Sequence, residues 1–171
     1  MAHSFTPWLQ FESQLAQWME QLACPALKFS GGRQCIPGLP SDSFRADAAL
    51  TNDRVLIAVE VEIRQTHPDT NVGKYWLLSD RRIYDKIILF HIYTPAYNSY
   101  GWRKTLGEFY AEKMKIELPF EYVLLDKRHA TDLGTAFQDV CLVIEPRVRQ
   151  EFANEFATVT GRHLRSPRRA Q

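Results

Sequence analysis

Residues 44–63 bring together three carboxylates whose types and spacing fit metal chemistry. Glu60 and Glu62 stand two residues apart in the run VLIAVEVEI, whose side chains alternate as in a β-strand, so both carboxylates lie on one face. A Thr-Asn-Asp sequence predicts a turn at 51–53. The hairpin closed by this turn brings Asp47 next to the Glu60 region, with the register open by one or two residues.

Three carboxylates within a largely apolar sheet repel one another and are poorly solvated when charged. A hard divalent cation relieves both costs, because Mg²⁺ and its relatives are held by one or two carboxylates together with waters and phosphate oxygens. The plain alternative is a hairpin with a solvated acidic face, since E-x-E is a short motif. The apolar flanks and the third acid favour the metal site. A two-carboxylate glycosidase is disfavoured, because Glu60 and Glu62 face the same way instead of flanking a sugar bond.

The overall composition predicts one globular domain. The 171 residues are 45% hydrophobic and 24% charged, which is ordinary for a chain with its own core. The formal charge is +1, but four arginines stand in the last ten residues, and the remainder has 17 basic and 20 acidic side chains. This nearly neutral body argues against tight nucleic-acid binding by charge alone. We place the domain at 1–165 and a basic disordered tail at 166–171.

Cysteine usage and hydropathy predict the compartment. Cys24, Cys35 and Cys141 are odd in number and lack C-x-x-C spacing, which fits neither a disulfide framework nor a zinc site. The start MAHSFTPW lacks the basic flank and apolar run of a signal peptide, and no stretch approaches membrane-spanning length. We therefore expect a soluble, cytoplasmic protein without a membrane partner.

Hydrophobic patterning predicts an α/β fold, a mixed sheet covered by helices. The apolar run 86–94 is expected to be a central strand, with His91 as a hydrogen-bonded core residue. Residues 140–144 fit either a helix or a strand, and Pro146 is expected to end that element before a last helix at 147–164. The other expected elements are helices at 6–24, 72–82, 102–116 and 131–137, and strands at 34–36 and 120–125.

Two helices carry charged residues that could assist the acids. With the helix capped at 70 or 71, Lys74 falls in its first turn, where the dipole favours acids, and this predicts an anionic partner, either a carboxylate or a phosphate. An exposed lysine is the alternative. Glu12 and Glu20 of the first helix are expected to face solvent, the alternative being that one of them is an outer metal ligand.

The position of Asp47, thirteen residues before Glu60-Val61-Glu62 on a helix–hairpin–helix–strand order, resembles the restriction-endonuclease-like, or PD-(D/E)XK, nuclease superfamily. The resemblance covers the chain from the first helix to about Thr94. It implies a restriction-endonuclease-like mixed central sheet flanked by helices, with an αβββαβ core followed here by C-terminal helices. Alanine stands before Asp47, where the family usually has proline.

The resemblance implies catalytic roles for Asp47, Glu60, Glu62 and Lys74. Asp47 and Glu60 would ligate Mg²⁺, or Mn²⁺ in its place, and Val61 would add its backbone carbonyl. Glu62 occupies the place where the family usually has lysine; as a third carboxylate it would let the site hold two metals, or it would act as general base. Lys74, from the next helix, is the natural substitute for the missing lysine.

The function implied is a metal-dependent endonuclease that hydrolyses phosphodiester bonds in DNA. Arg45, Arg64, His67 and Asn71 would bind the substrate. A homodimer is implied only by analogy, because many nucleases of this type cut both strands as dimers. The missing strand lysine motivates an alternative, a catalytically inactive nuclease-fold module that binds or regulates.

Overall fold

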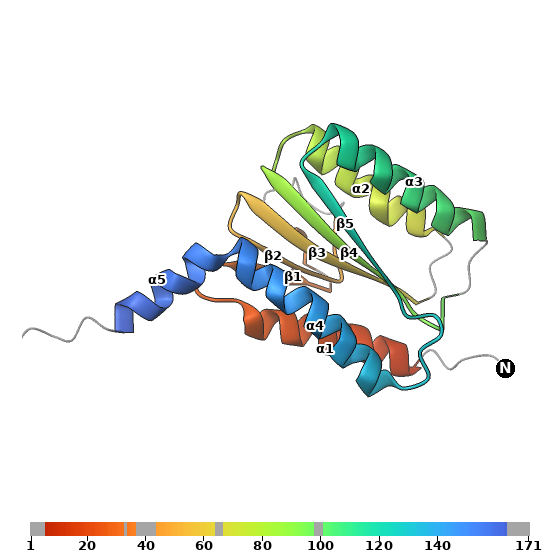
Figure 1. The fold of residues 1–171 in the computed structure, drawn as a ribbon, viewed down its shortest axis with the longest axis horizontal. Coiled ribbons are helices and arrows are strands. Elements are labelled where there is room, and N and C mark those ends of the chain that lie inside the picture. The colour runs from red at the N-terminus through yellow and green to blue at the C-terminus, as the bar shows by residue number, and fades with distance from the viewer. Residues whose placement is uncertain (1–5, 33, 37–43, 64–66, 98–100, 164–171) are drawn as a thin grey trace, which may run out of the picture.

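A mixed five-stranded sheet forms the centre of the chain and has helices on both faces (Figure 1). The computed structural model describes residues 6–32, 34–36, 44–63, 67–97 and 101–163, and the tail expected at 166–171 lies outside them. The α/β fold and the αβββαβ order expected from the sequence are confirmed. In chain order the elements are α1 (Thr6–Leu22), β1 (Lys28–Gly31), β2 (Ala48–Thr51), β3 (Val55–Glu62), α2 (Pro68–Asp80), β4 (Lys86–Tyr93), α3 (Gly101–Glu117), β5 (Phe120–Asp126), α4 (Leu133–Glu151) and α5 (Ala153–His163).

The strands follow one another across the sheet in the order β1-β2-β3-β4-β5. The first three are antiparallel, whereas β3, β4 and β5 are parallel and are connected through α2 and α3. Because parallel strands end at the same edge of a sheet, the register aligns Glu62 with Tyr93 and Tyr93 with Asp126. β2 runs the other way and therefore begins at this edge.

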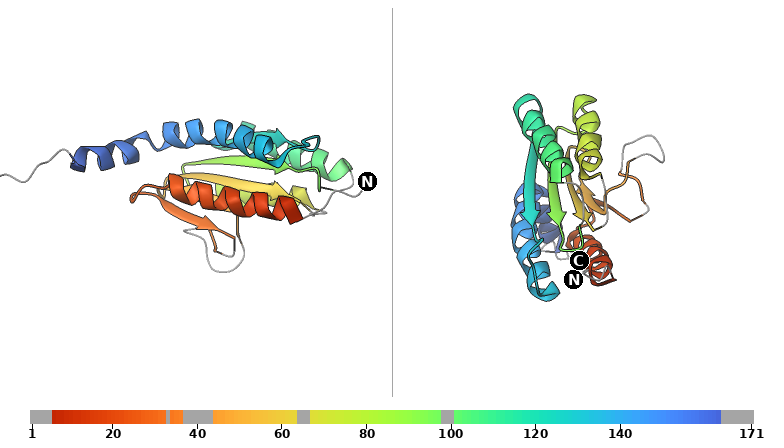
Figure 2. Two further views of the ribbon diagram at one scale, coloured as in Figure 1. Left: turned by 90° about the horizontal axis from the view of Figure 1, so that it is seen from below. Right: turned by 90° about the vertical axis from the view of Figure 1, so that its right-hand side faces the viewer.

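Both faces of β3 are buried, and the alternation expected from the sequence is confirmed. Ile57 and Val59 belong to the core on the side of α1 and α4, whereas Leu56 and Ala58 belong to the core on the side of α2 and α3 (Figure 2). Every residue of β3 except the first is buried. Such strands are typical of the parallel part of an α/β sheet, where helices cover both faces. The carboxylates at the end of β3 therefore lie in a setting that excludes water.

The first strand lies earlier in the chain than predicted. The sequence favoured a short strand at 34–36, but the strand that pairs with β2 is Lys28–Gly31. Near the predicted position there is an isolated bridge between Cys35 and Arg45. β1 lies at the edge of the sheet and buries only Ser30, so its sequence carries no alternation that could have revealed it.

α4 passes through Pro146, where the sequence predicted a break, and residues 140–144 are helical. A proline inside a helix leaves the carbonyl four residues earlier without its donor. Here that carbonyl belongs to Leu142, which is 73% exposed, so water can take the place of the donor. The next helix, α5, begins at Ala153. No helix in the described ranges combines the length and the apolar character needed to cross a membrane.

Candidate active site

Asp47 lies beside Glu60 at the edge where β2 begins and β3 ends. Ala48 pairs with Val59, so the next step of the register places Asp47 opposite Glu60 and fixes what the sequence left open. Asp47 Oδ2 accepts a hydrogen bond from the Val61 N–H at 2.6 Å, so the side chain takes the part that a main-chain carbonyl of the neighbouring strand plays elsewhere in the ladder. The N–H and C=O of one strand residue point to the same side, so the Val61 carbonyl also points toward Asp47.

The Glu60 carboxylate is buried, and α2 holds it in place. The residue is 2% exposed, and its Oε1 lies 2.7 Å from Lys74 Nζ and accepts the Tyr75 hydroxyl at 2.5 Å. Burial raises the pKa of Glu60 to about 8; the Lys74 charge opposes this shift and the Asp47 charge adds to it. Burial and the neighbouring Glu60 raise the pKa of Tyr75 well above its usual value, so the phenol remains a donor.

Lys74 reaches Glu60 from the second turn of α2, not from the first turn as predicted. The helix begins at Pro68, whose fixed φ suits the first helical position, and the predicted caps at 70–71 lie inside it. Lys74 Nζ also donates to the main-chain oxygen of Arg45 at 2.5 Å, and its side chain is only 14% exposed. The anionic partner is thus a carboxylate, although the dipole argument that predicted a partner was wrong.

Glu62 is fully buried next to Glu60 and is bonded through one oxygen. Its Oε1 accepts the amide of Asn71 at 2.8 Å and lies 2.7 Å from Nε2 of His91. Nδ1 of His91 lies 2.9 Å from the Tyr122 hydroxyl. Among the described residues, Glu62 Oε2 has no hydrogen-bond partner. His91 is therefore the hydrogen-bonded core residue that the sequence predicted, whereas Asn71, expected to bind substrate, contacts Glu62.

The pKa of the Asp47 carboxyl depends on its burial and on the charges of the groups around it. Burial is the largest effect and raises the pKa of Asp47; the hydrogen bond from Val61 and the Lys74 charge lower it. Glu62 raises the pKa of Asp47 further, and His91 lowers it. The charges of Lys74 on α2, Glu62 on β3 and His91 on β4 thus all act on Asp47, which immediately precedes β2.

A fourth carboxylate comes from α1. Glu12 is half-buried, and burial together with the charge of Asp47 raises its pKa to about 7. The expectation that Glu12 faces solvent is therefore wrong, whereas Glu20 is exposed as expected. The available signal was its position between Phe11 and Leu15, both in the buried stripe of the helix.

These groups fit a hard divalent cation. The donors at this edge are the carboxylates of Glu12, Asp47, Glu60 and Glu62 and the carbonyl of Val61. All are oxygens, which suit Mg²⁺ and Mn²⁺. A buried carboxylate oxygen without a partner is costly, and the unpartnered oxygen of Glu62 would gain from a nearby cation. Within the described part of the chain, no three carboxylate, imidazole or thiol groups form a ready-made cage. Mg²⁺ needs none, since it keeps several waters and takes one or two carboxylates.

The remaining predicted substrate-binding residues are dispersed. Arg45 is exposed and contributes its main-chain oxygen to Lys74. His67 is exposed at the position before α2, where its carbonyl accepts the Thr70 N–H at 3.1 Å. Arg64 lies outside the described residues. Of the predicted binding residues, only Asn71 contacts one of the clustered carboxylates through its side chain in the described part of the chain.

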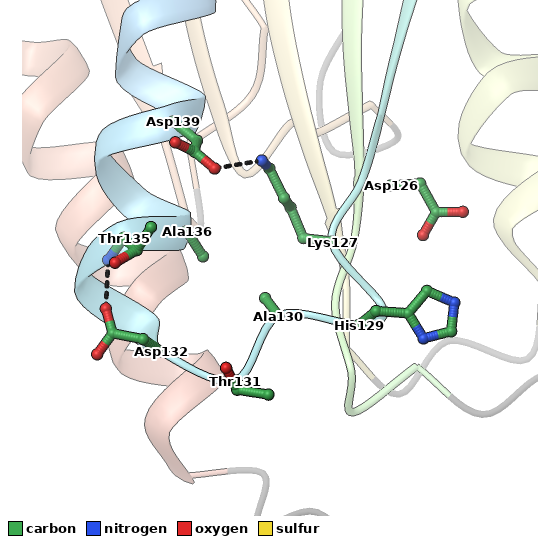
Figure 3. Close-up of a pocket in the computed structure, with 9 residues that line it drawn as sticks. All are labelled: Asp126, Lys127, His129, Ala130, Thr131, Asp132, Thr135, Ala136 and Asp139. Carbon is green, nitrogen blue, oxygen red and sulfur yellow. Dashed lines mark hydrogen bonds and ion pairs between the residues drawn. The ribbon is translucent and has the colours of Figure 1, made fainter.

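A cavity of about 380 Å³ opens at the same sheet edge, between the end of β5 and the start of α4 (Figure 3). Its carboxylates already have partners within the chain. Lys127 reaches across to Asp139 at 2.8 Å, and Asp132 accepts the N–H of Thr135 at 2.5 Å. Asp126 is in an ion pair as well. None of the residues lining this cavity belongs to β3, so it is separate from the carboxylate cluster.

The raised pKa values predict that the metal-free protein loses stability as the pH rises. Between about 4.5 and 8 the folded protein keeps a proton on Glu60 that the unfolded chain releases, so the free energy of unfolding falls with pH across this window. Glu12 adds a similar fall up to about pH 7. We expect the Tm in EDTA to drop by several degrees between pH 6 and pH 9, since 1 kcal/mol shifts the Tm of a chain this size by roughly 2–4 °C.

Thermal unfolding followed by circular dichroism checks this expectation. Glu60→Gln imitates the protonated carboxyl and should remove much of the pH dependence, whereas Glu20→Gln, at an exposed position, should leave it unchanged. A Tm in EDTA that rises steadily from pH 6 to pH 9 contradicts the prediction.

Comparison of the chain with models of protein families, with curated protein sequences and with solved structures found no match.

Proposed function

We propose that the chain is a metal-dependent nuclease of the PD-(D/E)XK type that hydrolyses phosphodiester bonds in DNA. The observation that carries the proposal is the contact between Lys74 and Glu60 at 2.7 Å, next to Asp47. The strand has glutamate where nucleases of this kind usually have lysine, and a lysine from the next helix contacts the neighbouring carboxylate. Two acids of the hairpin and a lysine from the next helix are groups that suit this hydrolysis.

Phosphodiester hydrolysis assigns a role to each of these groups. Hydrolysis forms a bond from a water oxygen to phosphorus and breaks the bond to the leaving oxygen, which then takes a proton. A divalent cation held by Asp47, Glu60 and the Val61 carbonyl would supply a Lewis acid and a water of lowered pKa. Lys74 places a positive charge beside the phosphate, where it stabilises the negative charge that develops on the phosphoryl oxygens. Tyr75 donates to Glu60 and restricts its rotation.

Burial strengthens these interactions. Glu60 is 2% exposed and the Lys74 side chain 14% exposed, so their charges act through a medium of lower polarity than water. Glu12, whose pKa the charge of Asp47 raises, would serve as an outer ligand or accept a proton. The exposed guanidinium of Arg45, whose main-chain oxygen binds Lys74, would contact the backbone of the nucleic acid.

The alternative, an inactive module with a nuclease fold, was motivated by the absence of lysine from the strand. The position of Lys74 supports the enzyme over the module, because its ammonium group contacts Glu60 and so offers a substitute for the missing lysine. Calorimetry separates the two proposals: an enzyme must bind Mg²⁺ or Mn²⁺ at Asp47 and Glu60, whereas a module without catalysis need not.

A panel of nucleic acids tests the proposed activity. Supercoiled plasmid, linear duplex DNA, single-stranded DNA and RNA are incubated with Mg²⁺, with Mn²⁺ and with EDTA. We expect cleavage of DNA with either metal and none in EDTA, because the carboxylates act through the ion. An Asp47→Asn protein purified in parallel identifies contaminating nucleases. A protein that cuts no member of the panel with either metal is not the nuclease proposed.

A further inference from the structure

We infer that His91 is a positioning residue, which holds Glu62 so that its free oxygen faces the divalent ion at Asp47 and Glu60. The inference rests on the proposed function and assigns the buried imidazole a part in it. The sequence and the proposed mechanism otherwise leave His91 as a core residue on β4.

The first observation is the unequal use of the two Glu62 oxygens. Oε1 takes both available partners, the amide of Asn71 at 2.8 Å and Nε2 of His91 at 2.7 Å. Oε2 is buried and has no partner among the described residues. An unpaired buried acceptor is costly, and a nearby cation would remove that cost. The arrangement binds Oε1 to the core partners and leaves Oε2 for a ligand.

The second observation is that His91 is itself fixed. Its Nδ1 lies 2.9 Å from the Tyr122 hydroxyl, and its ring lies against Tyr93 with centroids 4.7 Å apart. Both ring nitrogens therefore have a polar partner, Nε2 in Glu62 and Nδ1 in Tyr122. Tyr122, His91 and Glu62 therefore form a continuous chain of hydrogen bonds that holds the ring in one orientation. Thr94 also holds the strand here, donating its hydroxyl to the Glu62 carbonyl at 2.9 Å.

The third observation is the face of the sheet on which Glu62 lies. Glu60 and Glu62 are two residues apart in β3 and therefore lie on the same face of the sheet, and Asp47 lies opposite Glu60. A histidine that orients a carboxylate next to a metal ion is an outer partner of the metal site. Loss of such partners commonly weakens metal binding by about 10- to 100-fold.

Two amide substitutions separate orientation from mere packing. His91→Gln places an NH₂ group where Nε2 stood and keeps a donor for Glu62. His91→Asn is one methylene shorter, so its amide reaches only the position of Nδ1 and the donor to Glu62 is lost. Both variants keep a polar group in the buried site, and His129→Asn, at an exposed position, is the control. The measurement is calorimetric binding of Mn²⁺ alone, followed by the Mn²⁺ dependence of cleavage.

We expect His91→Asn to weaken Mn²⁺ binding by about 10- to 100-fold, and His91→Gln to bind much as the unchanged protein does. If both bind like the unchanged protein, the inference is overturned. Should His91→Asn fail to fold, Tyr122→Phe decides: it leaves the imidazole in place but removes the hydroxyl that holds Nδ1. Weaker Mn²⁺ binding supports the inference, and unchanged binding overturns it. An unchanged protein that binds no Mn²⁺ contradicts the proposed function itself, which is a separate result.

Discussion

Glu60→Gln is expected to lower the rate of DNA cleavage at least about a thousandfold while the protein stays folded. Glutamine keeps the Oε1 acceptor that Lys74 and Tyr75 contact, so the packing around it is retained. It loses the negative charge that would hold the cation. A metal ion contributes several kcal/mol to transition-state stabilisation, and each 1.4 kcal/mol is about a factor of ten in rate. Single-turnover cleavage at saturating DNA measures the change.

The control for this substitution is Glu20→Gln, the same chemical change at an exposed position of α1. It should cut DNA at the unchanged rate. Mn²⁺ binding to Glu60→Gln should weaken together with the rate, because the two depend on the same carboxylate. Cleavage by Glu60→Gln within tenfold of the unchanged protein means that Glu60 does not hold the catalytic ion.

The hairpin and its carboxylates could be predicted from the sequence because their signals are local. A turn sequence at 51–53 and strict alternation along 55–63 place Glu60 and Glu62 on one face and bring Asp47 opposite them. Local spacing is enough here, since the side chains of a strand alternate with a period of two. The exact register needed the pairing of Ala48 with Val59.

The partners of the carboxylates could not be predicted in the same way, because they come from other elements. The helical pattern did not single out Tyr75, and only the packing of α2 on the sheet brings its hydroxyl to Glu60. Glu12 was expected to face solvent, since its own helix does not reveal that the charge of Asp47 acts on it. The predicted start of α2 was wrong: Thr70 and Asn71 are residue types that favour a helix cap, but the helix begins earlier, at Pro68.

Lys74→Met is expected to separate catalysis from metal binding, which Glu60→Gln cannot do. The ammonium group lies 2.7 Å from Glu60 and lowers the pKa values of Glu60 and Asp47, so it competes with a cation for the same acids. Its removal should leave Mn²⁺ affinity equal or higher. The loss of one group that stabilises developing charge lowers the rate by about 100- to 1000-fold. The rate should therefore fall although the ion is bound.

Lys86→Met is the matched control. Lys86 lies at the beginning of β4, paired with Glu151 at 2.8 Å, and the clustered acids lie near the ends of the strands. It should leave both cleavage and Mn²⁺ binding unchanged, apart from an effect on stability. Calorimetry and single-turnover rates are compared for the two variants at one pH.

Should Lys74→Met cut DNA as fast as the unchanged protein, the helix lysine does not replace the lysine missing from β3, and Lys74 serves only to neutralise Glu60. Should it lose Mn²⁺ binding together with activity, Lys74 organises the carboxylates instead of acting on the phosphate.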